Sequence, residues 1–333
     1  MFLGRDMKVN TIYNPSTEGQ STMPSVTVVI PVYNGKRYIA DTLESAFAQT
    51  FCDYEIICVD DGSTDGSGAL LEAYGERVRV VRQSNAGQSA ARNAGAALAQ
   101  GQYIAFLDQD DRWYPSKLEQ QVAALTAAPD AVLAHCNYDR VDADGRMLQT
   151  GAALSERATA LASPLGRLLE EALIFPSAML VRRDAFQRAG GFDPALRGFE
   201  DFDLIARLKR QGRFVLLNET GMAYRFHGAG FSRAGGTEVM RSRERFLVRM
   251  QELYAGDRTK ETLIQDMLAD CYSDWGIHEA RQGNRAGGRA MLARSLLCHP
   301  GKMRTYSRLI RASLPQLQLS PIGKCIQKIL RRL

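Results

Sequence analysis

The chain has 333 residues, of which 45% are apolar, and a formal net charge of +5. A chain of this size can bury a full core and form one large domain with an appendage. No apolar run approaches the roughly 20 residues that cross a bilayer, and the longest candidate, 172–181, is interrupted by Pro176. Residues 1–24 are polar and turn-rich without the apolar core of a signal peptide, so we expect a loose segment.

Cysteine usage and charge distribution indicate the compartment and the partners. The six cysteines show no C-x-x-C pair or framework spacing, which is typical of buried thiols in a reducing compartment. Twelve of the 42 Lys and Arg residues follow Glu279, where no Asp or Glu occurs, and the preceding part is net acidic. This pattern argues against a nucleic-acid groove and indicates a tail that faces an anionic surface, such as a membrane.

Predicted strands and helices alternate in the first half of the chain. From apolar runs and helical spacing we predict strands at 26–30, 55–59, 78–81 and 103–107, and helices near 39–47 and 90–98. Ser116 and Glu119 form a capping box that opens a further helix, which Pro129 ends. Such alternation favours parallel strands joined by right-handed crossovers.

The second half is predicted to be mixed and then helical. We expect strands at 131–134, 178–181 and 214–217, and a helix at 201–210 that stops at Gly212. From about residue 237 the pattern is helical, and small residues within 275–296 favour a helical hairpin. We therefore divide the chain into a loose segment 1–24, an α/β domain 25–235 and a helical region 236–333.

Three motifs follow predicted strands. Residues 31–34 follow the first strand, Asp60 and Asp61 the second, and residues 108–111 the fourth. Parallel α/β sheets bind ligands at the carboxyl ends of their strands. We therefore expect all three motifs along one edge of the sheet.

The acids Asp108 and Asp110 predict a divalent cation. Mg²⁺ and Mn²⁺ prefer carboxylate oxygens and keep places for water and phosphate oxygens. Two acids separated by one residue at a strand exit can face one ion, and a phosphorylated donor can complete its shell. The alternative is a turn whose acids cap the next helix.

Other motifs also have two readings. Asp60 and Asp61 can accept hydrogen bonds from a nucleoside, or they belong to a strand–helix turn. Glu200 and Asp201 can act in catalysis, or they interact with the dipole of the helix that they begin. Trp113 either covers a sugar or packs in the core. The sequence has neither G-x-G-x-x-G nor a P-loop motif.

Five motifs in this order resemble the signature of the family 2 inverting glycosyltransferases. They are VVIPVYN at 28–34, VDDGSTD at 59–65, NAG and ARN within 85–93, DQDD at 108–111, and GFEDFDL at 198–204. The resemblance covers residues 26–233 and is specific for the family but not for the sugar. It implies a GT-A fold, in which a mostly parallel nucleotide-binding half and a mixed acceptor half share one sheet. An α-helical C-terminal appendage follows here.

The resemblance also implies roles for single residues. The predicted nucleotide contacts are Pro31 and Tyr33 in the base pocket, Asp60 and Asp61 on the nucleoside, Arg92 near the nucleotide, and Asp108 near the ribose or sugar. Asp110 would bind the metal that bridges the diphosphate, and Asp201 would be the general base. Glu200 would orient that base or contact the acceptor, and Trp113 is a further acceptor candidate.

His227 is a second candidate ligand for the metal. It lies in Tyr-Arg-Phe-His at 224–227, which is similar to a stretch that related enzymes carry after the last strand. A neutral imidazole could ligate the metal or contact the departing phosphate. A structural histidine is the alternative.

These residues fit the chemistry of inverting transfer. One base must take a proton from the acceptor hydroxyl, and such assistance is typically worth about 10²–10⁴-fold in rate. A metal acting as a Lewis acid stabilises the leaving nucleoside diphosphate.

We therefore predict a glycosyltransferase that depends on Mg²⁺ or Mn²⁺ and uses a nucleotide-sugar donor, with a UDP-sugar favoured. Its acceptor would be a saccharide or a lipid-linked saccharide in the synthesis of a cell-surface polysaccharide. A sugar nucleotidyltransferase and a non-catalytic module that binds a sugar nucleotide are the alternatives. Basic amphipathic segments after residue 301 either contact a membrane or pack on the body. We expect a cytoplasmic protein, free or peripheral at the inner face of the membrane, with no nucleic-acid partner.

Overall fold

The computed structural model describes residues 23–171, 174–227, 236–302, 305–306 and 308–309. The chain divides into two compact units. The first comprises Met1–Pro194 and Glu200–Gly230, and the second comprises Ala195–Phe199 and Phe231–Leu333. Most of the predicted loose segment lies outside the described residues, and the domain boundaries drawn from the sequence stay predictions.

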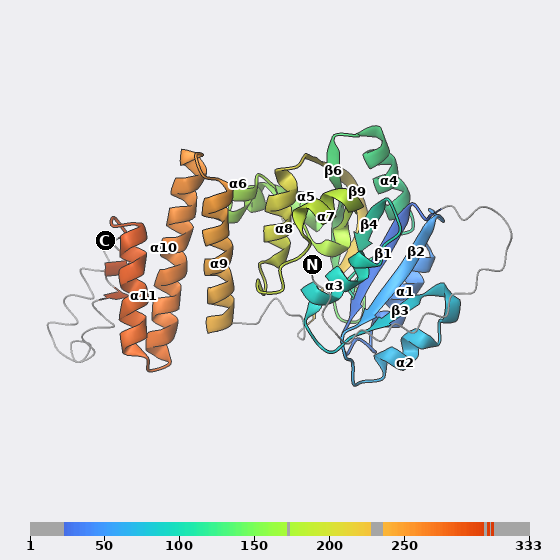
Figure 1. Ribbon diagram of the computed structural model, residues 1–333, viewed down its shortest axis with the longest axis horizontal. Coiled ribbons are helices and arrows are strands. Elements are labelled where there is room, and N and C mark those ends of the chain that lie inside the picture. Colours follow the sequence, from blue (N-terminus) through green and yellow to red (C-terminus); the bar gives the residue numbers. More distant parts are fainter. Residues whose placement is uncertain (1–22, 172–173, 228–235, 303–304, 307, 310–333) are drawn as a thin grey trace. The chain divides into compact units, whose positions relative to one another are not determined.

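Four parallel strands form one half of the sheet in the first unit (Figure 1). They are β1 (Val26–Val32), β2 (Tyr54–Asp60), β3 (Arg79–Arg82) and β4 (Tyr103–Phe106), in the spatial order β3-β2-β1-β4. The helices that follow β1, β2 and β3 are α1 (Ile39–Phe47), α2 (Ser67–Glu72) and α3 (Gln88–Ala97). This arrangement confirms the predicted parallel half.

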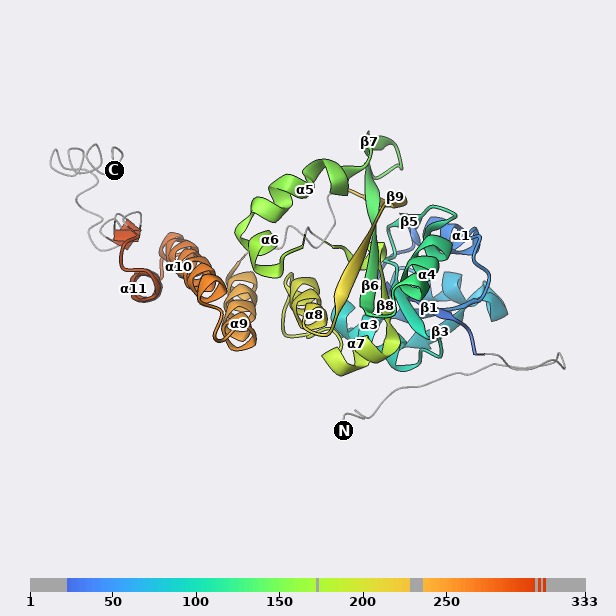
Figure 2. The ribbon, with the colours of Figure 1, turned by 90° about the horizontal axis from the view of Figure 1, so that it is seen from above.

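The other half of the sheet is mixed. The strand β8 (Met179–Arg182) runs antiparallel to both β4 and β6 (Ala131–Val141), and β6 pairs in parallel with β9 (Arg213–Arg225). Figure 2 shows β6 and β9 side by side. The short strands β5 (Arg112–Trp113) and β7 (Met147–Gln149) pair with β9 and β6, and the described residues thus form one nine-stranded sheet.

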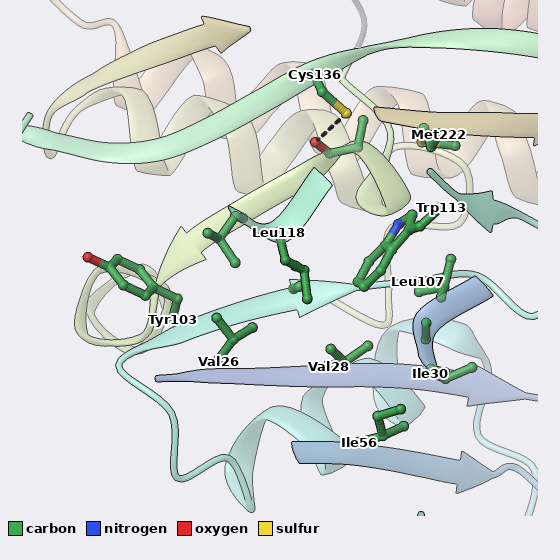
Figure 3. Packing of buried hydrophobic residues seen from close by; sticks show 14 of the residues in the cluster. Val26, Val28, Ile30, Ile56, Tyr103, Leu107, Trp113, Leu118, Cys136 and Met222 are labelled. Atoms are coloured by element: carbon green, nitrogen blue, oxygen red, sulfur yellow. Dashed lines mark hydrogen bonds between the residues drawn. The ribbon is translucent and has the colours of Figure 1, made fainter. Parts of the chain in front are cut away.

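Helices cover both faces of the parallel strands. Successive residues of a strand point to opposite faces, and since they are apolar here, both faces must be buried. Ile56 and Cys58 of β2 join the large core with α1 and α4 (Lys117–Ala127), whereas Ile57 and Val59 pack with α3. Gly95 allows α3 to approach the sheet closely, since a Cβ there would stand 2.4 Å from Val29. Figure 3 shows part of the large core.

The helix α4 begins where it was predicted, but the predicted capping box is wrong. Ser116 precedes α4 and makes no capping hydrogen bond. The carboxylate of Glu119 accepts a hydrogen bond from the Thr50 hydroxyl instead, at 2.7 Å. A tertiary partner thus replaces the local one that the sequence pattern favours.

The mixed half contains elements that the sequence did not predict. They are α5 (Ala152–Ala162), α6 (Pro164–Leu169), the 3-10 turn at Pro176–Ala178 and α7 (Arg183–Ala189). The predicted helix near 201–210 is present as α8 (Glu200–Lys209). The strands β6 and β9 extend well beyond the short apolar runs that predicted them.

In its described residues the second unit is helical. It contains α9 (Thr237–Leu253), α10 (Arg258–Arg281) and α11 (Arg285–Cys298). A Cβ on Gly276 or on Gly288 would lie 2.8 Å from the carbonyl oxygen of the other residue, so α10 and α11 form the predicted small-residue hairpin. No described helix is long and apolar enough to cross a membrane. Most of the predicted basic tail, including residues 310–333, lies outside the described residues.

Candidate active site

The loops after β1 and β2 meet at the carboxyl edge of the sheet. Val32 and Asp60, the last residues of the two strands, lie opposite each other. The backbone N–H of Asp61 donates to the Val32 carbonyl at 2.8 Å, and that of Asn34 donates to the Ser63 hydroxyl at 3.0 Å. Two of the predicted motifs are therefore in direct contact, as their positions at strand ends indicated.

Asp61 holds the loop that precedes α3. Its Oδ1 accepts hydrogen bonds from the Gln83 side chain and the Ala86 backbone, and its Oδ2 accepts one from the Gly87 backbone, at 2.7–2.9 Å. Asp60 is buried beside it. The contacts of both acids with a nucleoside stay predictions.

The side chain of Gln109 clamps the loop after β1. Its amide N–H donates to the Tyr33 carbonyl at 3.1 Å, and its oxygen accepts from the Tyr33 N–H at 2.9 Å. A Cβ at Gly35 would stand 2.2 Å from Gln109 Oε1, so a larger residue there would displace the Gln109 side chain from Tyr33. Pro31 is buried, whereas Tyr33 is 47% exposed, so its ring is available to stack on a planar base.

Arg92 links two of the predicted site acids. It is 1% exposed, its Nη2 donates to Asp108 at 2.6 Å, and its Nη1 lies 3.5 Å from Asp201 Oδ1. Burial alone would lower the pKa of Arg92, but the charges of Asp108 and Asp201 outweigh it and raise that pKa above its ordinary value. A fixed positive charge therefore lies between the acidic loop and the first turn of α8.

Asp201 is a carboxyl group that titrates near neutrality. A quarter of its side chain is exposed, but Oδ1 is buried and has no hydrogen-bond partner among the described residues. The pKa of Asp201 is raised to about 7, chiefly by burial. The charge of Arg92 opposes this rise, and the charges of Glu200 and Asp108 add to it. Such a group can accept a proton at neutral pH.

Glu200 is buried next to Asp201. Its Oε1 accepts a hydrogen bond from the side chain of Gln88, at the start of α3, and its Oε2 has no partner in the described part of the chain. The starts of α3 and α8 are thus joined through these two side chains. Glu200 is 3% exposed, so its burial favours the predicted role of orienting Asp201, and a contact with the acceptor stays a prediction.

Asp110 and His227 form a direct pair. Asp110 Oδ2 lies 2.8 Å from His227 Nε2. Burial and the charge of Asp108 raise the pKa of Asp110, whereas His227 lowers it. The structure therefore brings together the two residues that were predicted to bind the metal.

This pair fits part of a cation site. No group of three or more His, Cys, Asp or Glu side chains that could hold a metal occurs within the described ranges. Mg²⁺ takes octahedral ligands at about 2.0–2.1 Å, so adjacent ligands stand about 3 Å apart. The 2.8 Å contact of Asp110 and His227 is a hydrogen bond, and a cation that replaced its proton could bind both side chains at this separation, with the other ligands from a diphosphate and water.

Three successive residues of the acidic loop connect these parts. Asp108 pairs with Arg92 and through it with Asp201, Gln109 binds Tyr33, and Asp110 contacts His227. One short loop thus touches the predicted base pocket, general base and metal ligands. The predicted residues are therefore connected through direct contacts rather than scattered.

Trp113 does not have the predicted acceptor role. It is 3% exposed and lies in the large core (Figure 3), because β5 pairs with β9 and places Trp113 opposite Met222. Its indole N–H donates to the Ser177 carbonyl at 2.8 Å, and Lys117 Nζ stands 4.1 Å from the centre of its ring. The packing alternative is correct, and this side chain cannot cover a sugar.

Sequence reasoning missed three contacts of the site. Gln109 and Arg225 lie inside motifs that were identified, but patterns of acids and histidines drew no attention to them. Gln88 carries no signal besides its place between the NAG and ARN runs. Their roles depend on hydrogen bonds between distant segments, which spacing along the chain does not show.

Comparison with known proteins gives matches in one family. The model of the family described as Glycosyl transferase family 2 matches residues 27–190. An uncharacterized glycosyltransferase of Nostoc sp. is 32% identical over 245 residues, covering 70% of this chain and 74% of the relative. A putative teichuronic acid biosynthesis glycosyltransferase of Bacillus subtilis is 46% identical over 103 residues, or 30% of this chain and 41% of the relative. The chain spans 65% of the length of uncharacterized glycosyltransferases of Rickettsia prowazekii and Rickettsia typhi, each 31% identical.

A solved structure shares the fold. The crystal structure of S. aureus TarS 1–349 in complex with UDP-GlcNAc aligns with a TM-score of 0.64, covering 88% of this chain and 86% of that chain. The sequence identity is 19%, so the likeness concerns the fold alone. Together with the mixed sheet and the helical second unit, it confirms the predicted fold class.

Proposed function

Because the chain belongs to glycosyl transferase family 2, we propose that it transfers a sugar from a nucleoside-diphosphate sugar to an acceptor hydroxyl with inversion of configuration. The observation that carries this proposal is the series Asp108, Arg92 and Asp201. It places a carboxyl with a pKa of about 7 beside a fixed positive charge and next to the acidic loop. Inverting transfer needs a general base for the acceptor hydroxyl, on the face of the sugar opposite the departing diphosphate, and positive charge that stabilises this diphosphate.

Asp201 is the proposed base. A quarter of its side chain is exposed, so the carboxylate can receive the proton of an acceptor hydroxyl that binds against it. Arg92 Nη1 lies 3.5 Å from the buried Oδ1, which is close enough to stabilise the ionised form. Glu200, held by Gln88, is proposed to orient Asp201.

The proposed donor is a UDP-sugar, and the proposed product is a cell-surface polysaccharide. The exposed ring of Tyr33 supplies a surface for the base. The structure of TarS with UDP-GlcNAc supports the choice of nucleotide, and the relative described for teichuronic acid biosynthesis supports the choice of product class. The acceptor hydroxyl would belong to a saccharide or a lipid-linked saccharide.

Asp110 and His227 would hold Mg²⁺ or Mn²⁺. Their contact distance and the accumulation of acid around them support this assignment. When bound, the cation would act as a Lewis acid on the departing diphosphate. Arg92 would contribute a second, permanent positive charge near Asp108.

Replacing Asp201 with Asn tests the function. We expect Asp201→Asn to lower turnover of UDP-sugars by about 10²–10⁴-fold and to leave UDP affinity unchanged, because the amide keeps the shape of the carboxyl. The measurement is UDP release with a saccharide acceptor, alongside UDP binding by calorimetry. Asp184→Asn, at an exposed side chain of α7 in the same unit, is the control.

Two outcomes would contradict the proposal. Undiminished turnover in Asp201→Asn would remove Asp201 from the reaction. Pyrophosphate release from a nucleoside triphosphate and a sugar phosphate, without UDP release from a UDP-sugar, would favour a nucleotidyltransferase.

A further inference from the structure

The backbone of the acidic loop, residues 108–111, is held from outside. The Thr42 hydroxyl lies 2.8 Å from the carbonyl oxygens of both Gln109 and Asp111 and shares its one proton between them, and Nε of Arg225 donates to the Asp110 carbonyl at 2.8 Å. Within the loop, the Asp111 N–H donates to the Asp108 carbonyl at 3.1 Å. Thr42, on α1, is fully buried. The loop therefore has little freedom to change the direction of its side chains.

Asp111 is buried, and its carboxylate makes hydrogen bonds within the protein rather than facing the candidate cation site. It is 2% exposed, and its Oδ2 accepts from the Ser177 hydroxyl at 2.6 Å. The same hydroxyl oxygen accepts from the Asp108 N–H at 3.0 Å, and Asp111 Oδ1 accepts from the Arg225 N–H at 3.0 Å. Of the acids in the loop, Asp108 and Asp110 are therefore the ones left for ligands.

Arg225 uses its whole guanidinium group on the protein. It is 6% exposed, with Nε on the Asp110 carbonyl (2.8 Å), Nη1 on the Ala143 carbonyl (3.1 Å) and Nη2 on Asp41 (2.6 Å). Its guanidinium carbon stands 4.9 Å from the centre of the Tyr38 ring. A planar fork with five donors suits this set of partners, and an ammonium group does not.

The position of Arg225 connects the two halves of the candidate cation site. It ends β9, two residues before His227, and it binds the peptide of Asp110, whose carboxylate contacts His227. We infer that Arg225 is a positioning residue that, with Thr42, sets the separation of Asp110 and His227 before a cation and a diphosphate bind. Residues that orient metal ligands typically change affinity or activity about 10–100-fold when replaced.

This inference rests on the proposed function, and its test measures binding rather than turnover. The probe is Mn²⁺ in the presence of UDP, followed by loss of the electron paramagnetic resonance signal of free Mn²⁺. We expect Arg225→Lys to weaken Mn²⁺ binding about 10–100-fold. Arg112→Lys is the matched control, because Arg112 also pairs with Asp41 (3.3 Å) but is half-exposed, and we expect it to bind Mn²⁺ like the wild type.

Asp110→Asn separates failure of this inference from failure of the proposed site. If the wild type binds Mn²⁺ with UDP and Asp110→Asn does not, the cation site stands. Wild-type affinity in Arg225→Lys would then overturn the positioning role alone. If Asp110→Asn binds Mn²⁺ like the wild type, or the wild type binds none, both the site and the inference fall.

A second pair of variants covers the case in which Arg225→Lys does not fold. Thr42→Val keeps the shape of the side chain but removes the hydroxyl that binds two carbonyls of the loop, whereas Thr42→Ser keeps it. We expect weaker Mn²⁺ binding in Thr42→Val and recovery in Thr42→Ser, both measured well below their melting temperatures. Equal affinity in the two variants would overturn the inference.

Discussion

Two buried arginines flank the acidic loop, and they differ in how many of their hydrogen bonds the protein supplies. Arg225 uses all three guanidinium nitrogens on protein oxygens. Arg92 binds Asp108 through Nη2, but its Nε and Nη1 have no hydrogen-bond partner in the described part of the chain. The protein gives every nitrogen of Arg225 a hydrogen bond, whereas Arg92 has one hydrogen bond and an ion pair with Asp201 at 3.5 Å.

The acids beside the two arginines differ in the same way, in how many of their oxygens accept hydrogen bonds from the protein. Asp111, beside Arg225, has partners for both oxygens. Five buried side-chain atoms lack a hydrogen-bond partner among the described residues, and four of them belong to Arg92, Glu200 and Asp201. An unpaired buried polar group costs about 1–3 kcal/mol. These atoms gather around the proposed general base, so we take this side of the loop as the reacting side, whereas the side around Arg225, where the side-chain nitrogens of Arg225 and both oxygens of Asp111 are hydrogen-bonded, is a support.

The largest loss of stability is expected when Arg92 is replaced. Arg92→Met keeps much of the volume but leaves Asp108 and Asp201 without their shared cation. We expect the free energy of unfolding to fall by about 3 kcal/mol at pH 8, the low end for a broken buried pair, because both acids are about a quarter exposed. The loss should be smaller at pH 6, where Asp201 is protonated. Urea unfolding at the two pH values measures both.

Arg183→Met is the control for this prediction. Arg183 is partly buried and donates to the Ala99 carbonyl at 2.9 Å, with no carboxylate in that bond. Its loss should be smaller and the same at pH 6 and pH 8. An equally pH-independent loss in Arg92→Met would mean that the charge of Asp201 does not depend on Arg92.

The pH dependence of the rate tests the charge balance around Asp201. Since the pKa of Asp201 is about 7 and the base acts when ionised, kcat/KM should rise about tenfold per pH unit below that value and level off above it. Glu200→Gln should move this limb to lower pH, because the charge of Glu200 raises the pKa of Asp201. The exposed Glu72→Gln variant should leave it in place. A limb that stays in place in Glu200→Gln would show that the two acids are not coupled.

The same raised pKa has a consequence for stability. Between the ordinary value of 3.8 and about 7 the folded protein keeps a proton on Asp201 that the unfolded chain releases. The contribution of this group to the free energy of unfolding therefore falls as pH rises through that range. Asp201→Asn should remove this fall, and an unchanged slope would assign it to another group.

The parallel half of the fold could be predicted because its strands are continuous apolar runs. All seven residues of β1 are buried, and β2 is buried from Ile56 onward. Once the strands were placed, the rule that ligands bind at carboxyl ends placed Asp61 and Asp108 at the same edge. Local pattern and tertiary structure agree there.

The mixed half could not be predicted as well because its long strands contain buried polar residues. The strand β6 continues through Asn137 and Asp139, and Asp139 accepts hydrogen bonds from the Tyr114 hydroxyl (2.7 Å) and the Gly151 N–H (2.8 Å). These partners lie in other segments, so the sequence alone reads such residues as a loop. The acceptor role predicted for Trp113 is wrong for a related reason, since the pairing of Trp113 with β9 decides which way its ring points.

The smallest effect is expected when Gln109 is replaced, because both polar atoms of its side chain already make hydrogen bonds to Tyr33. Gln109→Ala removes two neutral hydrogen bonds to Tyr33, each worth roughly 0.5–1.5 kcal/mol, and loosens the loop that is proposed to bind the base. We expect UDP affinity to fall by roughly tenfold or less, and the KM for the donor to rise with kcat unchanged. Gln149→Ala, at an exposed bond to Ser155, is the control. A fall in kcat without a change in UDP affinity would place Gln109 with the reacting groups and end the distinction between the two sides of the loop.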